Sequence, residues 1–116
     1  MKLNKIYFEL DKATIRPEAI SSLDEIFMVM KEFPELKIEI GSHTDARASK
    51  EYNLDLSQRR AKATKAYLLN KGISENRLKA IGYGEKRLLN DCNGDSKCSE
   101  EEHQQNRRSE FRVIEE

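Results

Sequence analysis

The sequence predicts an α/β fold, with one β-sheet covered by helices in a single domain of 116 residues. Two observations support this prediction. The spacing of apolar residues switches repeatedly between the two-residue period of a strand and the three- and four-residue spacing of a helix. The resulting order, strand–helix–strand–helix–strand–loop–strand, is typical of one sheet with helices packed against it. No linker, repeat or low-complexity tract interrupts residues 1–116, so we expect one compact α/β sandwich.

The first half of the chain supplies two strands and one helix. Alternating apolar residues predict half-buried strands over 5–10 and over 36–40. Between them, Pro17 suits the first position of a helix, and Pro34 ends that helix. The apolar residues expected to face the sheet from this helix are Ile20, Leu23, Phe27 and Met30, with Ile26 and Phe33 at the flanks of the stripe.

The second half begins with a polar loop over residues 41–50, followed by a long helix over 51–71 that Gly72 closes. Residues 78–83 form a weaker strand pattern. Residues 88–105 are polar and irregular, with one helical turn expected over 99–104. Phe111 and Val113 belong to the last strand.

Charge and hydropathy exclude several classes of function. The 21 basic residues balance the 21 acidic ones, so no net field draws the chain to nucleic acid or to an anionic membrane. No apolar run approaches the roughly 20 residues needed to cross a bilayer. The segment starting at Met1 has no apolar signal core, which fits both a complete cytosolic protein and a domain excised from a longer exported protein.

Asp45 and Arg60 are the candidate binding residues. Asp45 ends the polar motif that follows the second strand, and Arg60 lies beside the packing stripe of the long helix. Charged residues seldom face a core without a compensating partner. The two residues could pair with each other and fix the loop to the helix, or together they could grip a ligand that carries an ammonium and a carboxylate. Thr44 and Asn53 add hydrogen-bonding groups that a single ion pair would not need, which favours a pocket.

The helical phase distinguishes Arg60 from its neighbour Arg59. Residues seven apart differ by about 20° around a helix, so Asn53 and Arg60 share a face. That face also carries the residues expected to pack on the sheet, Leu56, Ala61, Thr64 and Leu68. Arg59 is rotated by about 100° from Arg60 and is expected in solvent.

The sequence gives little support for a catalytic site or a metal site. His43 and His103 are too far apart in sequence to assemble three ligands with Asp45, so His43 is expected to be a structural residue. Cys92 and Cys98 lack zinc-module spacing. The alternation of Asp91, Asn93 and Asp95 suggests a calcium loop, but an acidic turn is the simpler interpretation because the other ligands are missing.

Several spaced motifs resemble the OmpA-like C-terminal domain family. They are FELDKATIRPE at 8–18, GSHTD at 41–45, YNLDLSQRRA at 52–61, GYGE at 82–85 and NRR at 106–108. The resemblance extends over about residues 5–114. It implies a two-layer sandwich with a mixed four-stranded sheet. It also implies a non-enzymatic domain that needs no cofactor and binds peptidoglycan non-covalently through the diaminopimelate residue of the stem peptide.

The resemblance assigns roles to individual positions. Asp45 corresponds to the family's conserved acid and Arg60 to its helix arginine. Thr44 and Asn53 line the site, together with the loop backbone that includes Asp11 and Ala13. Arg107 is the expected additional arginine. Asp45 would accept hydrogen bonds from the ligand's ammonium, while Arg60 would donate two to its carboxylate.

The same resemblance implies a periplasmic location. The domain would be the C-terminal part of a longer exported protein that is associated with the outer membrane and does not itself span it. In that oxidising compartment Cys92 and Cys98 are expected to form a disulfide, which would stabilise the fold by roughly 2 kcal/mol. An envelope adaptor that uses this fold to bind another protein is the alternative function.

Overall fold

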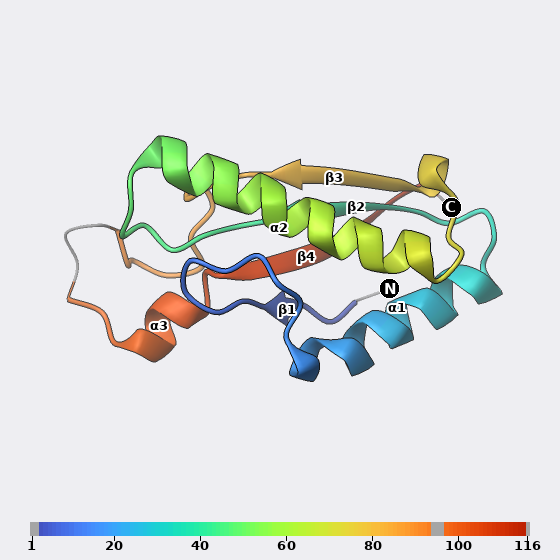
Figure 1. Ribbon diagram of the computed structural model, residues 1–116, viewed down its shortest axis with the longest axis horizontal. Helices are drawn as coiled ribbons and strands as arrows, with labels where there is room; N and C mark the ends of the chain where they lie inside the picture. The colour runs from blue at the N-terminus through green and yellow to red at the C-terminus, as the bar shows by residue number, and fades with distance from the viewer. Residues whose placement is uncertain (1–2, 94–96, 116) are drawn as a thin grey trace.

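The computed structural model describes residues 3–93 and 97–115. In chain order its elements are β1 (Ile6–Tyr7), the 3₁₀ turn Pro17–Ala19, α1 (Ile20–Glu32), β2 (Lys37–Ser42), α2 (Lys50–Asn70), the 3₁₀ turn Glu75–Arg77, β3 (Leu78–Gly82), α3 (Glu100–Gln104) and β4 (Arg108–Glu115) (Figure 1). This order is the one that the sequence predicts.

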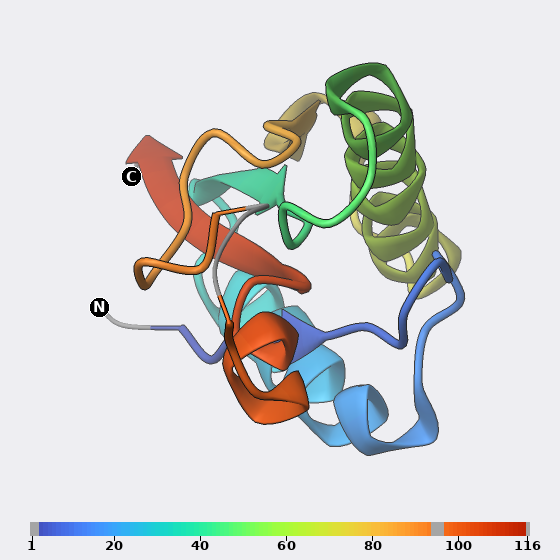
Figure 2. The same ribbon diagram turned by 90° about the vertical axis from the view of Figure 1, so that its left-hand side faces the viewer.

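The four strands form one mixed sheet in the order β1-β4-β2-β3. β2 pairs in parallel with β3, whereas β4 runs antiparallel to both β1 and β2. The two long helices, α1 and α2, lie on the same face of this sheet (Figure 2). The expected two-layer α+β architecture with a mixed four-stranded sheet is therefore confirmed.

The hydrophobic core lies between that sheet face and the two helices. Ile38 and Ile40 of β2 are fully buried in it, beside Phe111 of β4. On α1 the buried residues are Leu23, Ile26 and Met30.

The expected phase of α1 is therefore partly wrong. Ile20 is exposed and Phe27 only half-buried, whereas Ile26, expected at the flank, is fully buried. The helix has apolar residues on both sides of its stripe, so spacing alone could not fix which side faces the sheet.

The first strand is shorter than predicted. Only Ile6 and Tyr7 pair with β4, although the Phe8 amide still donates to the Arg107 carbonyl at 2.8 Å. Alternation with Ile6 and Phe8 places Leu10 on the buried face of the predicted strand, but Leu10 is 47% exposed, so that part of the prediction is wrong. The chain turns at Asp11, which has a positive φ of 58°. The residues expected to extend the strand instead form a loop at the end of the sheet.

Helix α2 follows the prediction closely. The Ser49 hydroxyl caps it by accepting from the Tyr52 amide, and Gly72, with a φ of 110°, lies just beyond its last turn. Its buried residues are the expected ones plus Ser57: Asn53, Leu56, Ser57, Arg60, Ala61, Thr64 and Leu68. The helix packs closely on β3, since a Cβ on Gly82 would lie 2.4 Å from the Gln58 amide nitrogen.

The expected turn over 99–104 is confirmed as α3, which begins with a capping box between Ser99 and Glu102. The expected disulfide joins Cys92 to Cys98, the residue just before this cap. Asp95, part of the predicted acidic turn, lies outside the described residues. Within the described residues, no helix is both long and apolar enough to cross a membrane.

Candidate functional site

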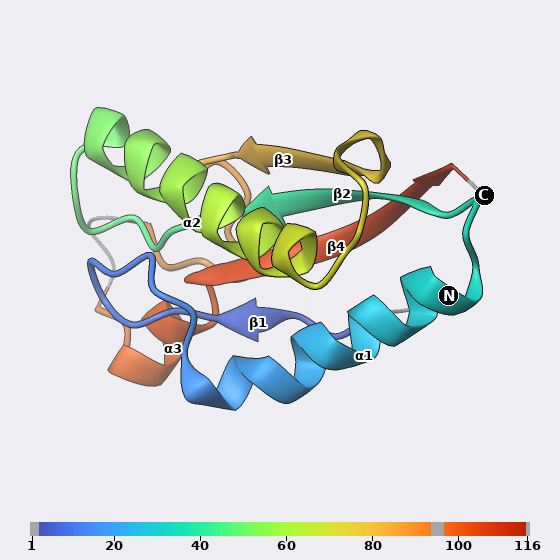
Figure 3. The same ribbon diagram turned by 45° about the vertical axis from the view of Figure 1, so that its right-hand side comes forward.

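The predicted site lies at the end of the sheet where β2 and β3 finish and β4 begins (Figure 3). Four segments meet there: the loop after β1, the loop between β2 and α2, the first turns of α2, and the residues that follow α3. They enclose a pocket of about 230 Å³. Its wall consists of Leu10, Asp11, Asp45, Arg47, Ala48, Asn53, Leu56, Arg60 and Arg107.

Asp45 is a buried carboxylate held by two arginines. Its Oδ2 accepts from Arg47 Nη2 at 2.8 Å and from Arg107 Nη1 at 3.2 Å, and its Oδ1 accepts from the Arg47 amide at 3.1 Å. Burial alone would raise the pKa of Asp45, but the hydrogen bonds from Arg47 and Arg107 outweigh it and hold the pKa below its ordinary value. Asp45 is therefore ionised at neutral pH.

Arg60 reaches the pocket from α2, and its guanidinium is bonded to the main chain. It donates from Nε to the Lys12 carbonyl at 2.9 Å, from Nη1 to the His43 carbonyl at 3.0 Å and from Nη2 to the Glu9 carbonyl at 3.0 Å. A guanidinium has five N–H groups, so two remain beyond these three bonds. Arg60 thus joins two loops to α2 and still faces the pocket.

Burial lowers the pKa of Arg60 to about 10, and the nearby charge of Arg107 acts in the same direction, against that of Asp45. The guanidinium nevertheless remains positive at neutral pH. It also lies 5.1 Å from the centre of the Phe8 ring, a cation–π contact.

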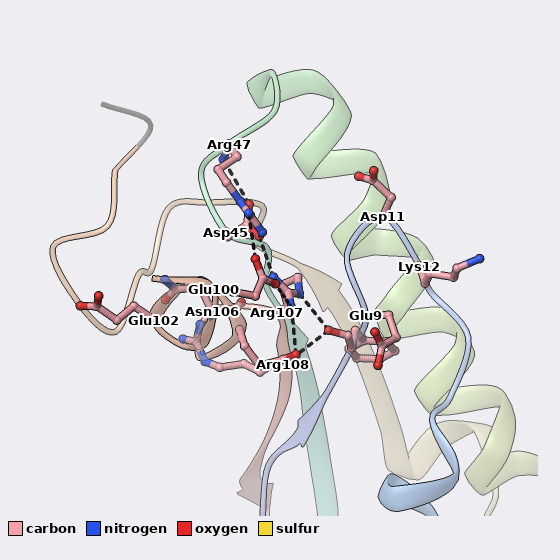
Figure 4. Close-up of polar contacts among 12 residues, drawn as sticks. Glu9, Asp11, Lys12, Asp45, Arg47, Glu100, Glu102, Asn106, Arg107 and Arg108 are labelled. Carbon is pink, nitrogen blue, oxygen red and sulfur yellow. Dashed lines mark hydrogen bonds and ion pairs between the residues drawn. The ribbon is translucent and has the colours of Figure 1, made fainter. Parts of the chain in front are cut away.

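Arg107 is also buried, and together with Arg47 it reaches Asp45 (Figure 4). Besides Asp45, it donates to the Phe8 carbonyl and to Gln104 Oε1, and its Nη2 lies 2.8 Å from Glu100 Oε1. Glu100 also accepts from Arg47 Nη1 at 3.1 Å. The two arginines are therefore shared between Asp45 inside the pocket and Glu100 outside it.

Asp11 and Asn53 complete the polar part of the wall. Asp11 lies on the loop beside α2 and accepts from the Tyr52 hydroxyl at 3.1 Å (Figure 4). Asn53 donates from Nδ2 to the Ala48 carbonyl and to Glu85 Oε1.

The structure brings five of the seven predicted binding residues into the pocket wall: Asp11, Asp45, Asn53, Arg60 and Arg107. Thr44 and Ala13 lie outside it. Thr44 is buried, with no hydrogen-bond partner for its hydroxyl among the described residues, and Ala13 is half-buried in the loop.

Within the described residues, no ion pair joins Asp45 to Arg60. The alternative in which these two residues simply pair with each other is therefore wrong. Arg59 points to solvent and pairs with Asp55 at 2.8 Å, as the helical phase predicts.

Two charged residues at or beside the pocket, Arg47 and Glu100, were not predicted from the sequence. Arg47 could have been found from its position two residues after Asp45, close enough for its side chain to return to that carboxylate. Glu100 gave no local signal, because it is one of three consecutive acids at the start of a short helix. Only the fold brings it to the pocket.

His43 has a structural role, as expected. Its ring is buried, stacks on Tyr83 with a centroid distance of 5.3 Å, and lies 3.3 Å from a Glu110 oxygen. Burial lowers the pKa of His43 to about 4, helped by the charges of Arg108 and Arg87 and opposed by Glu110. The imidazole is therefore neutral at neutral pH.

Among the described residues, one group of side chains has ligand atoms close enough together to hold a metal ion. It consists of Cys92, Cys98 and Glu102. The two cysteines are joined in the disulfide, so they offer no thiolates to a metal.

The pocket suits a small zwitterionic group. Its wall holds three guanidinium groups and two carboxylates, and thus one excess positive charge. The volume of about 230 Å³ is below the usual range of pockets that enclose a whole small molecule, so the end of a side chain fits better than a sugar. A carboxylate would be drawn to the arginines, and an ammonium to the carboxylates.

Comparison with known proteins finds relatives of this chain. A profile of the OmpA family matches residues 7–102. The chain is 38% identical over 106 residues to the peptidoglycan-associated lipoprotein of Brucella melitensis, covering 91% of this chain and 60% of that protein. It is 34% identical over 86 residues to outer membrane porin F of Pseudomonas fluorescens, covering 74% of this chain and 26% of the porin.

The crystal structure of the peptidoglycan-associated lipoprotein from Burkholderia pseudomallei has a similar fold, with a TM-score of 0.84 and 26% identity. The match covers 97% of this chain and 89% of that one. The chain spans about 60% of the length of the first of these curated relatives.

Proposed function

Because this chain belongs to the OmpA family, a non-enzymatic family, we propose that it binds peptidoglycan non-covalently through the diaminopimelate residue of the stem peptide. The free end of diaminopimelate carries an ammonium and a carboxylate on one carbon. The observation that carries the proposal is the small pocket in which a buried carboxylate, Asp45, and a buried guanidinium with unused donors, Arg60, face the same space.

The available hydrogen-bonding groups match this ligand. Asp45 Oδ1 receives one hydrogen bond from the protein, and a carboxylate oxygen can accept two, so Oδ1 has room for the ligand's ammonium. Arg60 offers its two remaining N–H groups to the ligand's carboxylate. Charge-assisted hydrogen bonds of this kind contribute roughly 1.5–3 kcal/mol each. After the cost of ordering the ligand, weak to moderate affinity is expected.

The relatives also guide the proposed location. They are named as an outer membrane porin and as peptidoglycan-associated lipoproteins. We place this domain in the periplasm, attached to the outer membrane through the rest of an exported parent protein. There it would anchor that protein to the cell wall.

Sedimentation with purified peptidoglycan that contains diaminopimelate tests the proposal. The wild-type protein should sediment with the wall, and free diaminopimelate should release it. Asp45→Asn keeps the size of the side chain but removes its charge, so binding should fall at least about fivefold. Asp55→Asn is the matched control, because Asp55 is an exposed acid of α2 whose partner is Arg59.

Circular dichroism should show both variants folded. A wild-type protein that stays in the supernatant would reject wall binding and favour the adaptor function. Sedimentation that free diaminopimelate does not compete, and that Asp45→Asn does not weaken, would reject this ligand while keeping the wall as partner.

A further inference from the structure

Glu100 completes a ring of alternating charges at the edge of the pocket. Its two oxygens bind Arg47 Nη1 at 3.1 Å and Arg107 Nη2 at 2.8 Å. The same two arginines meet again at Asp45 Oδ2, at 2.8 and 3.2 Å. Glu100 is not part of the pocket wall, and its side chain is 58% exposed.

This ring of charges fixes the positions of the Arg47 and Arg107 guanidinium groups. Each of them has one nitrogen on Asp45 and another on Glu100, so the acids hold the guanidinium groups from opposite sides. Without the charge of Glu100, Asp45 alone would attract Arg47, whose side chain is one-third exposed and free of backbone restraint at its tip. Arg47 would then be drawn to Asp45 alone, and its guanidinium would be lost as a partner for the ligand's carboxylate.

The helix that carries Glu100 depends on neighbouring contacts. α3 has only five residues, too few to be stable by itself. Asn90 fastens its far end by donating to the Glu102 carbonyl and to Gln105 Oε1. At its near end the disulfide ties the fully buried Cys92 to Cys98, which precedes the Ser99 cap.

We propose that Glu100 is a positioning residue that sets the cationic wall of the pocket, and that the Cys92–Cys98 disulfide fixes the helix that carries it. The oxidation state of this disulfide then determines how well the pocket distinguishes a ligand carboxylate. The inference rests on the proposed function, because the affected ligand is the diaminopimelate end of the stem peptide.

Two muropeptides measure the effect, one with a free diaminopimelate carboxylate and one with that carboxylate amidated. The dissociation constant of the amidated muropeptide, divided by that of the free one, reports how well the arginines recognise the carboxylate. A larger ratio means stronger recognition. Glu100→Gln should lower this ratio about threefold to tenfold. Glu101→Gln is the matched control, because Glu101 is an exposed acid in the same first turn whose side chain lies outside the ring. It should leave the ratio unchanged.

Reduction tests the second half of the proposal. Dithiothreitol, itself oxidised to a cyclic disulfide, converts the bridge to two thiols and should lower the same ratio in the wild-type protein. The double variant Cys92→Ser, Cys98→Ser should show the lowered ratio from the start and should not respond to dithiothreitol. Thermal unfolding of each sample confirms that a folded protein is being titrated. Should the reduced protein unfold, Glu100→Gln still decides the role of Glu100.

The outcomes separate the inference from the function on which it rests. A wild-type protein that prefers the free carboxylate, beside a Glu100→Gln variant with an unchanged ratio, rejects the inference alone. An equal loss of affinity for both muropeptides in Glu100→Gln would also reject the inference, because it would show that Glu100 supports the fold and does not affect recognition of the carboxylate. A wild-type protein that binds neither muropeptide rejects the proposed function and the inference together.

Discussion

The pocket has two cationic walls that are supported in different ways. On the α2 side, Arg60 is bonded to the backbone carbonyls of Glu9, Lys12 and His43. On the α3 side, Arg47 and Arg107 are bonded mainly to the carboxylates of Asp45 and Glu100. Backbone acceptors do not titrate or change rotamer, whereas carboxylates do. The first wall is therefore part of the fold. In the second wall Arg107 keeps one main-chain acceptor, the Phe8 carbonyl, whereas the partly exposed Arg47 can adjust to pH or to neighbouring contacts.

The pKa shifts of two arginines reflect the same difference. Burial lowers the pKa of Arg60 to about 10. The pKa of Arg47 is instead raised, first by its hydrogen bond to Asp45, and its side chain is one-third exposed. Burial removes a cation such as Arg60 from water, and the rest of the fold must offset this desolvation free energy. A partly exposed cation beside an acid, such as Arg47, is stabilised by its partner and can also move away from it.

The largest effect is expected from removing the α2 wall. Arg60→Ala leaves three carbonyls and the cavity of a fully buried side chain, so the free energy of unfolding should fall by about 3–5 kcal/mol. Arg59→Ala, the adjacent control, removes only an exposed pair with Asp55 and should change it by less than about 1 kcal/mol. Urea unfolding monitored by circular dichroism measures both.

Equal stability of these two variants would contradict the structural role assigned to Arg60. The guanidinium of Arg60 serves the fold as well as the proposed site, because three of its donors bind the main chain. Loss of wall binding in Arg60→Ala would therefore be ambiguous, which is why Asp45→Asn tests the ligand.

Acid should weaken the α3 wall selectively. The pKa of Asp45 is lower in the folded protein than its value of about 3.9 in an unfolded chain, so its stabilising effect is complete above that value and is lost as the pH falls through the folded pKa. The stability difference between wild type and Asp45→Asn should shrink as the pH falls from 5 to 2, by at most about 2.6 kcal/mol, because one titrating group contributes no more than about 1.4 kcal/mol per pH unit. Denaturant titrations at each pH measure it. A difference that stays constant would show that the arginines do not depend on the charge of Asp45.

A smaller effect is expected for Arg47→Ala. Arg47 lies on the α3 wall but is partly exposed, so the free energy of unfolding should fall by only about 0.5–1 kcal/mol. Binding of a diaminopimelate muropeptide should weaken about twofold to fivefold, because Arg107 still holds Asp45 and Arg60 is untouched. Calorimetry and thermal melting give the two quantities. A loss of stability as large as that of Arg60→Ala would remove the distinction between the walls.

The two walls also differ in how far the sequence could predict them. Arg60 was predictable because a helix has a fixed period, and the buried residues around it follow that period. The main-chain carbonyls that Arg60 binds were not predictable from the sequence. The chain leaves the first strand after Tyr7 and turns at Asp11 with a positive φ. Alternation of apolar residues gave no sign of that departure, so Leu10 was expected in the core.

The α3 wall shows the same limit more strongly. Arg107 could be nominated from the family motif, but its partner Glu100 lies seven residues before it on a helix of one turn. The approach of Glu100 to Arg47, 53 residues away in sequence, depends on tertiary packing. In α1, apolar residues on both sides of the stripe left the phase undetermined, and only contact with the sheet fixes it.

The most direct test of the account is a calorimetric titration with two matched muropeptides that differ at the third stem residue. One carries diaminopimelate, and the other carries lysine, which keeps the ammonium but lacks the neighbouring carboxylate. Asp45 would find its partner in both, whereas the two remaining N–H groups of Arg60 would have no carboxylate to bind in the lysine form. An unmet charged group costs more than roughly 1–3 kcal/mol, so the lysine form should bind at least about tenfold more weakly. Equal dissociation constants for the two muropeptides would contradict recognition of diaminopimelate by this pocket.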